Sequence, residues 1–145
     1  MYNALSSKVA FDNLEDQLSG PLGVHPVAAD AVAVACHSDA WGVGGAYVEV
    51  VPASTITKDF FLDSLVIENV SAADTFLFYI ATGAAAAEAV VALGRGAFGH
   101  VTNCGTLNIP IRKKISANTR IAVKAACKTA VALTASVSIS YRTIS

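Results

Sequence analysis

Hydrophobic and polar residues alternate along much of this chain. In the segment 129–142 (TAVALTASVSISYR), Val137, Ile139 and Tyr141 each follow a serine. Side chains of an extended strand point alternately to opposite faces, so this pattern predicts a strand with one buried and one solvated face. The segments DTFLFYIAT and FFLDSLVIENV are rich in aromatic and β-branched residues, which favour strands. AYVEVVP is a further short strand that ends at Pro52, which lacks an N–H for a ladder.

The pattern predicts eight strands separated by short turns. They lie near residues 31–37, 45–51, 56–69, 75–82, 88–98, 107–115, 119–128 and 131–142. Eight such strands predict an all-β fold, a two-sheet jelly-roll β-sandwich with an N-terminal arm.

Residues 81–100 (ATGAAAAEAVVALGRGAFGH) are ambiguous on their own. The alanines favour a helix, and the glycines around Arg95 suggest a phosphate-binding loop. A phosphate loop needs a following Lys-Ser or Lys-Thr and a helix, and neither is present. Between strands we therefore predict a loop at GAAAA and a strand at EAVVALGRGAF, with Gly94 or Gly96 marking a bulge or a close approach.

The first 30 residues have a different pattern and predict an arm ahead of the sandwich domain at 31–145. Phe11, Leu14 and Leu18 are spaced to share one face of a short helix, Ser7 is placed to cap it, and Gly20-Pro21 is placed to stop it. The next segment, PLGVHPV, has the composition of a linker. The arm can pack on its own domain or reach a neighbour, and the pattern leaves both open.

The composition indicates a surface that is hidden in an assembly. Of the 145 residues, 54% are hydrophobic and 14% are charged, against about 25% charged in an ordinary soluble domain. Such a surface suits contact with copies of the chain or with a larger assembly. We find neither a secretory signal nor a membrane-spanning segment. The three cysteines (Cys36, Cys104 and Cys127) form no close pair, which favours synthesis in a reducing cytoplasm and small apolar core roles.

The charges are segregated along the chain. All eleven acidic residues lie between Asp12 and Glu88, and the eight Lys and Arg from Ala89 onward have no acidic residue among them. A basic C-terminal half could bind nucleic acid. We favour compensation, within the fold or across subunit contacts, because the basic residues are not interleaved with stacking aromatics. Nucleic acid is therefore not an expected partner.

No motif indicates catalysis, a metal or a cofactor. His37, Ser38 and Asp39 are consecutive, so their side chains diverge on an extended chain and do not form a triad. His100 and Cys104 lack the second pair that a zinc site needs. We expect no enzymatic activity and no cofactor.

Two further features have competing interpretations. Arg112, Lys113 and Lys114 follow Pro110 and could contact an anion or an acidic surface; we favour a solvated strand edge that lysines protect against aggregation. Trp41, in AWGVGG, is expected as a buried corner residue, with a ligand platform and a subunit contact as alternatives.

An ordered set of short segments resembles small jelly-roll proteins of bacteriophage particles, namely the capsid decoration (cement or cap) proteins and related fibre-tip domains. The matching segments are Trp41-Gly42, EVVPAS at 49–54, a Phe-rich strand from Phe60, Tyr79 before Gly83, Glu88 opening the next strand, NIPI at 108–111, ANTRI at 117–121 and the closing ISYR. The resemblance covers roughly residues 40–142. The strand at 60–70 is more apolar than the pattern, the alanines at 84–87 enlarge a loop, and the arm matches no known pattern.

The resemblance implies a structural virion protein, made in the host cytoplasm, that binds the major capsid protein on the outer shell as a homotrimer and stabilises it. It implies no catalytic residues. Possible partner contacts are Phe11, Leu14, Leu18, Trp41, Arg112, Lys113 and Lys114. The alternative is a receptor- or carbohydrate-binding jelly roll of a tail fibre or spike, for which Trp41, Tyr47 and Tyr79 are the available platforms.

Overall fold

A computed structural model describes residues 22–27, 30–37, 41, 45–98, 107–129 and 131–144. The predicted helix with Phe11, Leu14 and Leu18 lies outside the described residues, as do Ser38, Asp39, His100 and Cys104.

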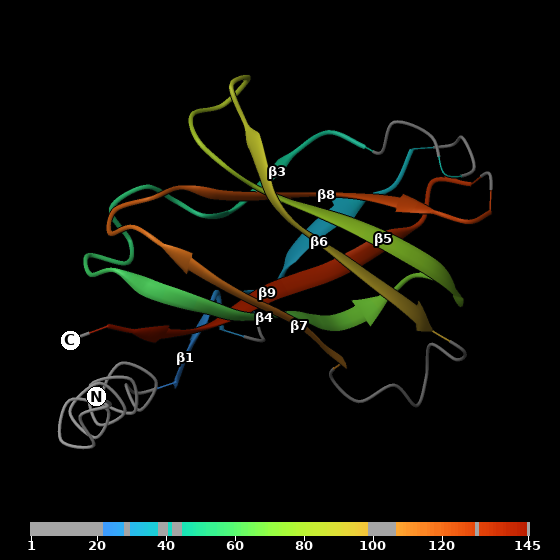
Figure 1. Ribbon diagram of the computed structural model, residues 1–145. Helices are drawn as coiled ribbons and strands as arrows, with labels where there is room; N and C mark the ends of the chain where they lie inside the picture. Colours follow the sequence, from blue (N-terminus) through green and yellow to red (C-terminus); the bar gives the residue numbers. More distant parts are fainter. Residues whose placement is uncertain are drawn as a thin grey trace, which may run out of the picture.

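The described residues form nine strands and no α-helix (Figure 1). They are β1 (Leu22–His25), β2 (Val32–Ala35), β3 (Val48–Val51), β4 (Phe60–Val70), β5 (Asp74–Thr82), β6 (Ala89–Phe98), β7 (Leu107–Ile115), β8 (Ile121–Cys127) and β9 (Thr134–Thr143).

The strands build two antiparallel sheets, which face each other as the two layers of a sandwich (Figure 1). One sheet has the order β1-β9-β4-β7, with β2 also paired to β9, and the other has the order β3-β8-β5-β6. β1 pairs with β9 from His25 to Leu22 and β2 pairs with the other end of β9, so the two short strands occupy one position of the sheet. With that position counted once, the eight strands have the two four-stranded sheets of a jelly roll, as the alternation predicts.

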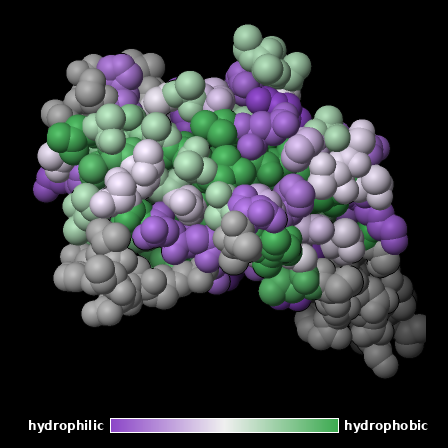
Figure 2. Space-filling view, turned by 180° about the vertical axis from the view of Figure 1, so that it is seen from behind, coloured by the Kyte–Doolittle hydropathy of each residue, from purple (hydrophilic) through white to green (hydrophobic). Residues whose placement is uncertain are grey.

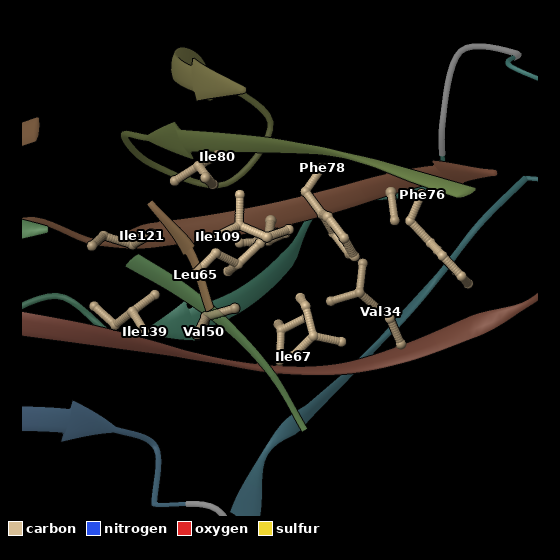
Figure 3. Close-up of a cluster of buried hydrophobic side chains, with 14 of the residues drawn as sticks. Val34, Val50, Leu65, Ile67, Phe76, Phe78, Ile80, Ile109, Ile121 and Ile139 are labelled. Atoms are coloured by element: carbon tan, nitrogen blue, oxygen red, sulfur yellow. The ribbon is translucent and has the colours of Figure 1, made fainter. Parts of the chain in front are cut away.

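The core fills the space between the two sheets (Figure 3). The alternation explains which side chains enter it: Phe76, Phe78 and Ile80 of β5 are fully buried, whereas Leu77 and Tyr79 between them point to the other face. Val137 and Ile139 of β9 meet them from the opposite sheet, as the spacing predicts. Most of β8 is buried on both faces, because Ala122 and Ala126 are buried on its outer side.

The predicted strands agree with the observed ones apart from the first. The sequence indicates a linker at PLGVHPV, but Leu22–His25 is strand β1. The linker prediction is wrong here, because Gly23 lies within a strand that pairs with β9 and Pro26 comes only after that strand. Gly23 lies where a side chain would collide with the ring of Tyr141, 2.6 Å from an added Cβ, and Pro26 follows directly after the strand ends.

The ambiguous segment resolves into a loop at residues 83–88 and the strand β6. Gly94 and Gly96 mark a close approach: a Cβ on Gly94 would lie 3.0 Å from Cγ2 of Ile109, and one on Gly96 would lie 3.3 Å from its Cδ1. The bulge itself lies elsewhere in β6. Ile80 pairs with Ala92 and Ala81 with Val90, which leaves Val91 as the extra residue.

β7 is an edge strand that carries several features that oppose aggregation. Pro110 removes one N–H from the strand, and a bulge sets Ile111 and Arg112 against Asp63 alone, with Arg112 at a φ of 55°. Arg112, Lys113 and Lys114 are all exposed. This placement agrees with the interpretation of a solvated, protected edge.

Candidate binding surface

The outer face of the β3-β8-β5-β6 sheet gathers aromatic, apolar and cationic side chains. We call it the aromatic face and define it by Trp41, Tyr47, Leu77, Tyr79, Leu93, Arg95 and Lys124. The register explains this assembly. Tyr79 of β5 pairs with Lys124 of β8 on one side and with Leu93 of β6 on the other, and Leu77 pairs with Arg95. Directly paired residues present their side chains to the same face.

Trp41 lies at one end of the aromatic face and is 40% exposed. The expectation of a buried corner residue is therefore wrong. The Arg95 guanidinium lies 5.4 Å from the centre of the Trp41 ring, and both side chains line an open hollow of about 320 Å³ together with Leu77. Trp41 has a φ of 49°, which is uncommon for a bulky residue, and its N–H donates to the Cys127 carbonyl. Backbone and cation together hold this ring at the surface.

Two tyrosines and a lysine form the middle of the aromatic face. The Nζ of Lys124 lies 4.9 Å from the ring centre of Tyr47 and 5.0 Å from that of Tyr79. A cation over the face of each ring is attracted to both, which favours this arrangement of the three side chains. Burial, with the negative charge of Glu88, raises the pKa of Tyr47, so its hydroxyl stays protonated and can donate a hydrogen bond.

At the end of this sheet away from Trp41, Arg120 binds two glutamates and a backbone carbonyl. Its Nε donates to Oε2 of Glu49 at 2.6 Å, and its Nη1 donates to Oε1 of Glu88 at 3.1 Å and to the Gly83 carbonyl at 3.0 Å. Burial works against the charged form, but the bonds to the two glutamates raise the pKa of Arg120 above its ordinary value. Here a basic residue of the second half pairs with acidic residues of the first, as charge compensation predicts.

Two apolar side chains of β6 on this side of the sheet, Leu93 of the aromatic face and Val90 beside the face, are open to solvent. Leu93 is 59% exposed and Val90, on the same strand, is 50% exposed. Soluble chains seldom leave large apolar side chains beside exposed aromatic rings without a partner.

The structure separates the predicted site residues. Trp41, Tyr47 and Tyr79 share the aromatic face, whereas Arg112, Lys113 and Lys114 lie on the edge of the other sheet. The sequence did not single out Leu77, Leu93 or Arg95, because their place beside Trp41 depends on the register between strands.

No metal centre forms among the described residues. They contain no group of three or more His, Cys, Asp or Glu side chains that could hold a metal ion. Cys36 and Cys127 are buried free thiols, as predicted. Burial, a hydrogen bond with Cys127 and nearby negative charge raise the pKa of Cys36 to about 12, so it is not a nucleophile at neutral pH. In the part of the chain that the structure describes, no helix has the length and apolar character needed to cross a membrane.

Comparison with known proteins gives little more. No protein-family model and no curated protein matches the sequence. The chain is similar to part of a solved structure of the CBM22-1 and GH10 modules of the Clostridium thermocellum N-terminal endo-1,4-β-D-xylanase 10B, complexed with xylohexaose. The identity is 12%, the TM-score is 0.33, and the match covers 83% of this chain and 26% of that one. A likeness at this level transfers no property to the present chain.

Proposed function

We propose that this chain is a structural protein of a virus particle, which binds the outer surface of the capsid and stabilises the shell. The observation that carries the proposal is the aromatic face, where Leu93 and Trp41 are open to solvent, with Val90 exposed on the same strand as Leu93. Burying such a patch against another protein is favourable. The patch supports assembly, and the resemblance of residues 40–142 to decoration proteins supports the capsid as the partner.

The proposed assembly is a homotrimer on the virion surface, made in the host cytoplasm. Many copies on one lattice make weak single contacts sufficient, because each bound copy raises the effective concentration of the others.

The proposal is tested by mixing purified protein with undecorated capsids of the virus that encodes it and sedimenting the particles. We expect the wild-type chain to co-sediment and Leu93→Asp to be lost from the pellet, because a charge would be buried in the contact. Val131→Asp is the matched control, since Val131 is 44% exposed but lies outside the aromatic face. It should bind like the wild type. Absence of wild-type protein from the pellet would refute the capsid role.

A second candidate function is carbohydrate binding, as in a receptor-binding fibre tip. The favouring observation is that Trp41, Tyr47 and Tyr79 lie on one face with adjacent cations, and that the Trp41 ring is exposed. Aromatic rings stack on the apolar faces of sugars, and charged groups can bind their hydroxyls. A glycan array would decide: a hit that Trp41→Ala abolishes, with no capsid binding, would replace the first proposal.

A further inference from the structure

An apolar groove crosses the outer face of the other sheet, beside β1. It has a volume of about 410 Å³. One wall is formed by three exposed apolar side chains, those of Leu22, Val24 and Val27. In the view from behind, hydrophobic side chains gather at the lower rim of the molecule, on the side where β1 lies (Figure 2). This surface is on the opposite sheet from the aromatic face, so one contact cannot cover both.

Two serine hydroxyls on the floor of the groove bond to each other. Ser64 of β4 and Ser140 of β9 are buried there and share a hydrogen bond of 2.5 Å between their hydroxyls. Val66 adds an apolar surface, and the acidic side chains of Asp63 and Glu68 also line the groove. With these two hydroxyls paired to each other, and with Leu22, Val24, Val27 and Val66 in its lining, the groove offers an occupant mainly apolar contact.

The chain itself supplies a matching segment. Residues 1–21 precede Leu22, which is part of the wall, so they enter the structure at the groove. The spacing of Phe11, Leu14 and Leu18 predicts one apolar face on a short helix. Three residues separate Leu18 from Leu22, which limits the distance between their Cα atoms to about 14 Å. Leu18, at the end of that apolar face, therefore cannot lie far from the wall.

The charges of the segment also fit one orientation. On the predicted helix, Asp12 and Asp16 lie on the side opposite to the apolar face, whereas Lys8 and Glu15 share one flank, which carries no net charge. With the apolar face inward, the two aspartates are directed away from the acidic side chains that line the groove. The opposite orientation would bring these like charges together.

We propose that residues 8–18 of the same chain pack their apolar face into this groove. A short tether gives an effective concentration in the millimolar range. A contact with a dissociation constant of only about 0.1 mM would then keep the groove roughly nine-tenths filled. The apolar segment of a second copy would have to compete with this effective concentration to enter the groove. The inference goes beyond the proposed function, because it assigns the arm to its own sandwich.

The test is a double-mutant comparison in the full-length chain. Leu14→Asp removes an apolar contact from the segment, and Val24→Asp does so from the wall. We expect each to lower the thermal midpoint by about 5 °C and to increase binding of a hydrophobic dye several-fold. The double variant should be as stable as the less stable single variant, because both substitutions remove one contact. Val9→Asp, on the opposite side of the predicted helix, is the matched control and should leave both readings unchanged.

The outcomes separate the possible occupants. If the occupant is the chain's own segment, the midpoint differences should stay the same when the protein is diluted about 100-fold, since a tethered contact does not depend on concentration. Additive effects of Leu14→Asp and Val24→Asp, or no effect of Leu14→Asp, would overturn the proposal. A loss caused by Val24→Asp that appears only at high concentration, with a change in sedimentation, would overturn it in favour of a second copy. Capsid co-sedimentation is a separate measurement, so either proposal can fail without the other.

Discussion

At the scale of single residues, Arg120 carries the clearest stabilising contact of the outer sheet surface. It links Glu49 of β3, Glu88 before β6 and the carbonyl of Gly83 in the loop between β5 and β6. The Glu88 side chain is only 9% exposed, so its carboxylate depends on this partner more than the open Glu49 does. A pair with one buried member is worth more than an exposed surface pair.

Arg120→Met is therefore expected to destabilise the protein by about 1–3 kcal/mol, because Glu88 would keep its charge without a partner. Urea unfolding followed by circular dichroism measures the change. Lys113→Met, on the exposed edge of β7, is the control and should lie within about 0.5 kcal/mol of the wild type. Equal effects of the two substitutions would show that the Arg120 network contributes nothing.

Cys36 provides a prediction about pH. Its pKa is raised from 9.0 to about 12 by burial, by the bond with Cys127 and by nearby negative charge. The thiol of the unfolded chain loses its proton near pH 9 while the folded one keeps it, so unfolding releases a proton above pH 9. Stability from this group is present below pH 9 and falls as the pH rises towards 12.

Two measurements check this behaviour. Iodoacetamide at about pH 8.5 should leave Cys36 unmodified in the folded chain and alkylate it in urea, as read by peptide mass spectrometry. The stability difference between wild type and Cys36→Ala should shrink between about pH 8 and pH 10.5. Alkylation of Cys36 at similar rates with and without urea would contradict the burial of this thiol.

At the scale of elements, the strands were largely predictable and the contacts between them were not. Alternation in β5 and β9 indicates which side chains enter the core, since that choice is local to each strand. β1 was missed because Gly23 and Pro26 carry turn signals that a single sequence cannot separate from packing needs. The bulges at Val91 and Arg112 depend on register, as do the contacts of the aromatic face. Such non-local pairings leave no periodic signal.

The close packing of β6 against β7 gives a test at this scale. An added Cβ at Gly94 would lie 3.0 Å from the Cγ2 of Ile109. A larger side chain would therefore press on the side chains of Ile109 and Ile111. Gly94→Val should destabilise the protein by about 1–3 kcal/mol through overpacking. Ala97→Val adds two methyl groups to the exposed side of the same strand and is expected to be nearly neutral. If thermal unfolding shows the same midpoint for both variants, the close approach is not present in solution.

At the scale of the whole molecule, the sandwich presents two different apolar surfaces on opposite sheets. The aromatic face has rings and cations that suit a partner, and the groove beside β1 lies next to the chain's own first residues. We therefore assign the first to assembly and the second to the arm. The low charge content of the chain is consistent with both assignments, since a covered surface needs less charge for solubility.

Self-association is expected from the same low charge content and exposed apolar side chains. Sedimentation velocity at micromolar concentration should give the mass of a trimer, three times 14.9 kDa. A monomer at every concentration would show that the chain does not form a trimer by itself. Multivalent binding would then have to come from the capsid lattice alone.

Stabilisation of the shell by this protein can be measured by heating the particles. Undecorated capsids with packaged genome are warmed with a dye that fluoresces on released nucleic acid, with and without saturating protein. We predict a higher release temperature with the wild-type chain and with Val131→Asp, and no increase with Leu93→Asp, because ligands that bind only the intact state raise its stability. A release temperature that saturating wild-type protein leaves unchanged would show that the protein does not stabilise the shell.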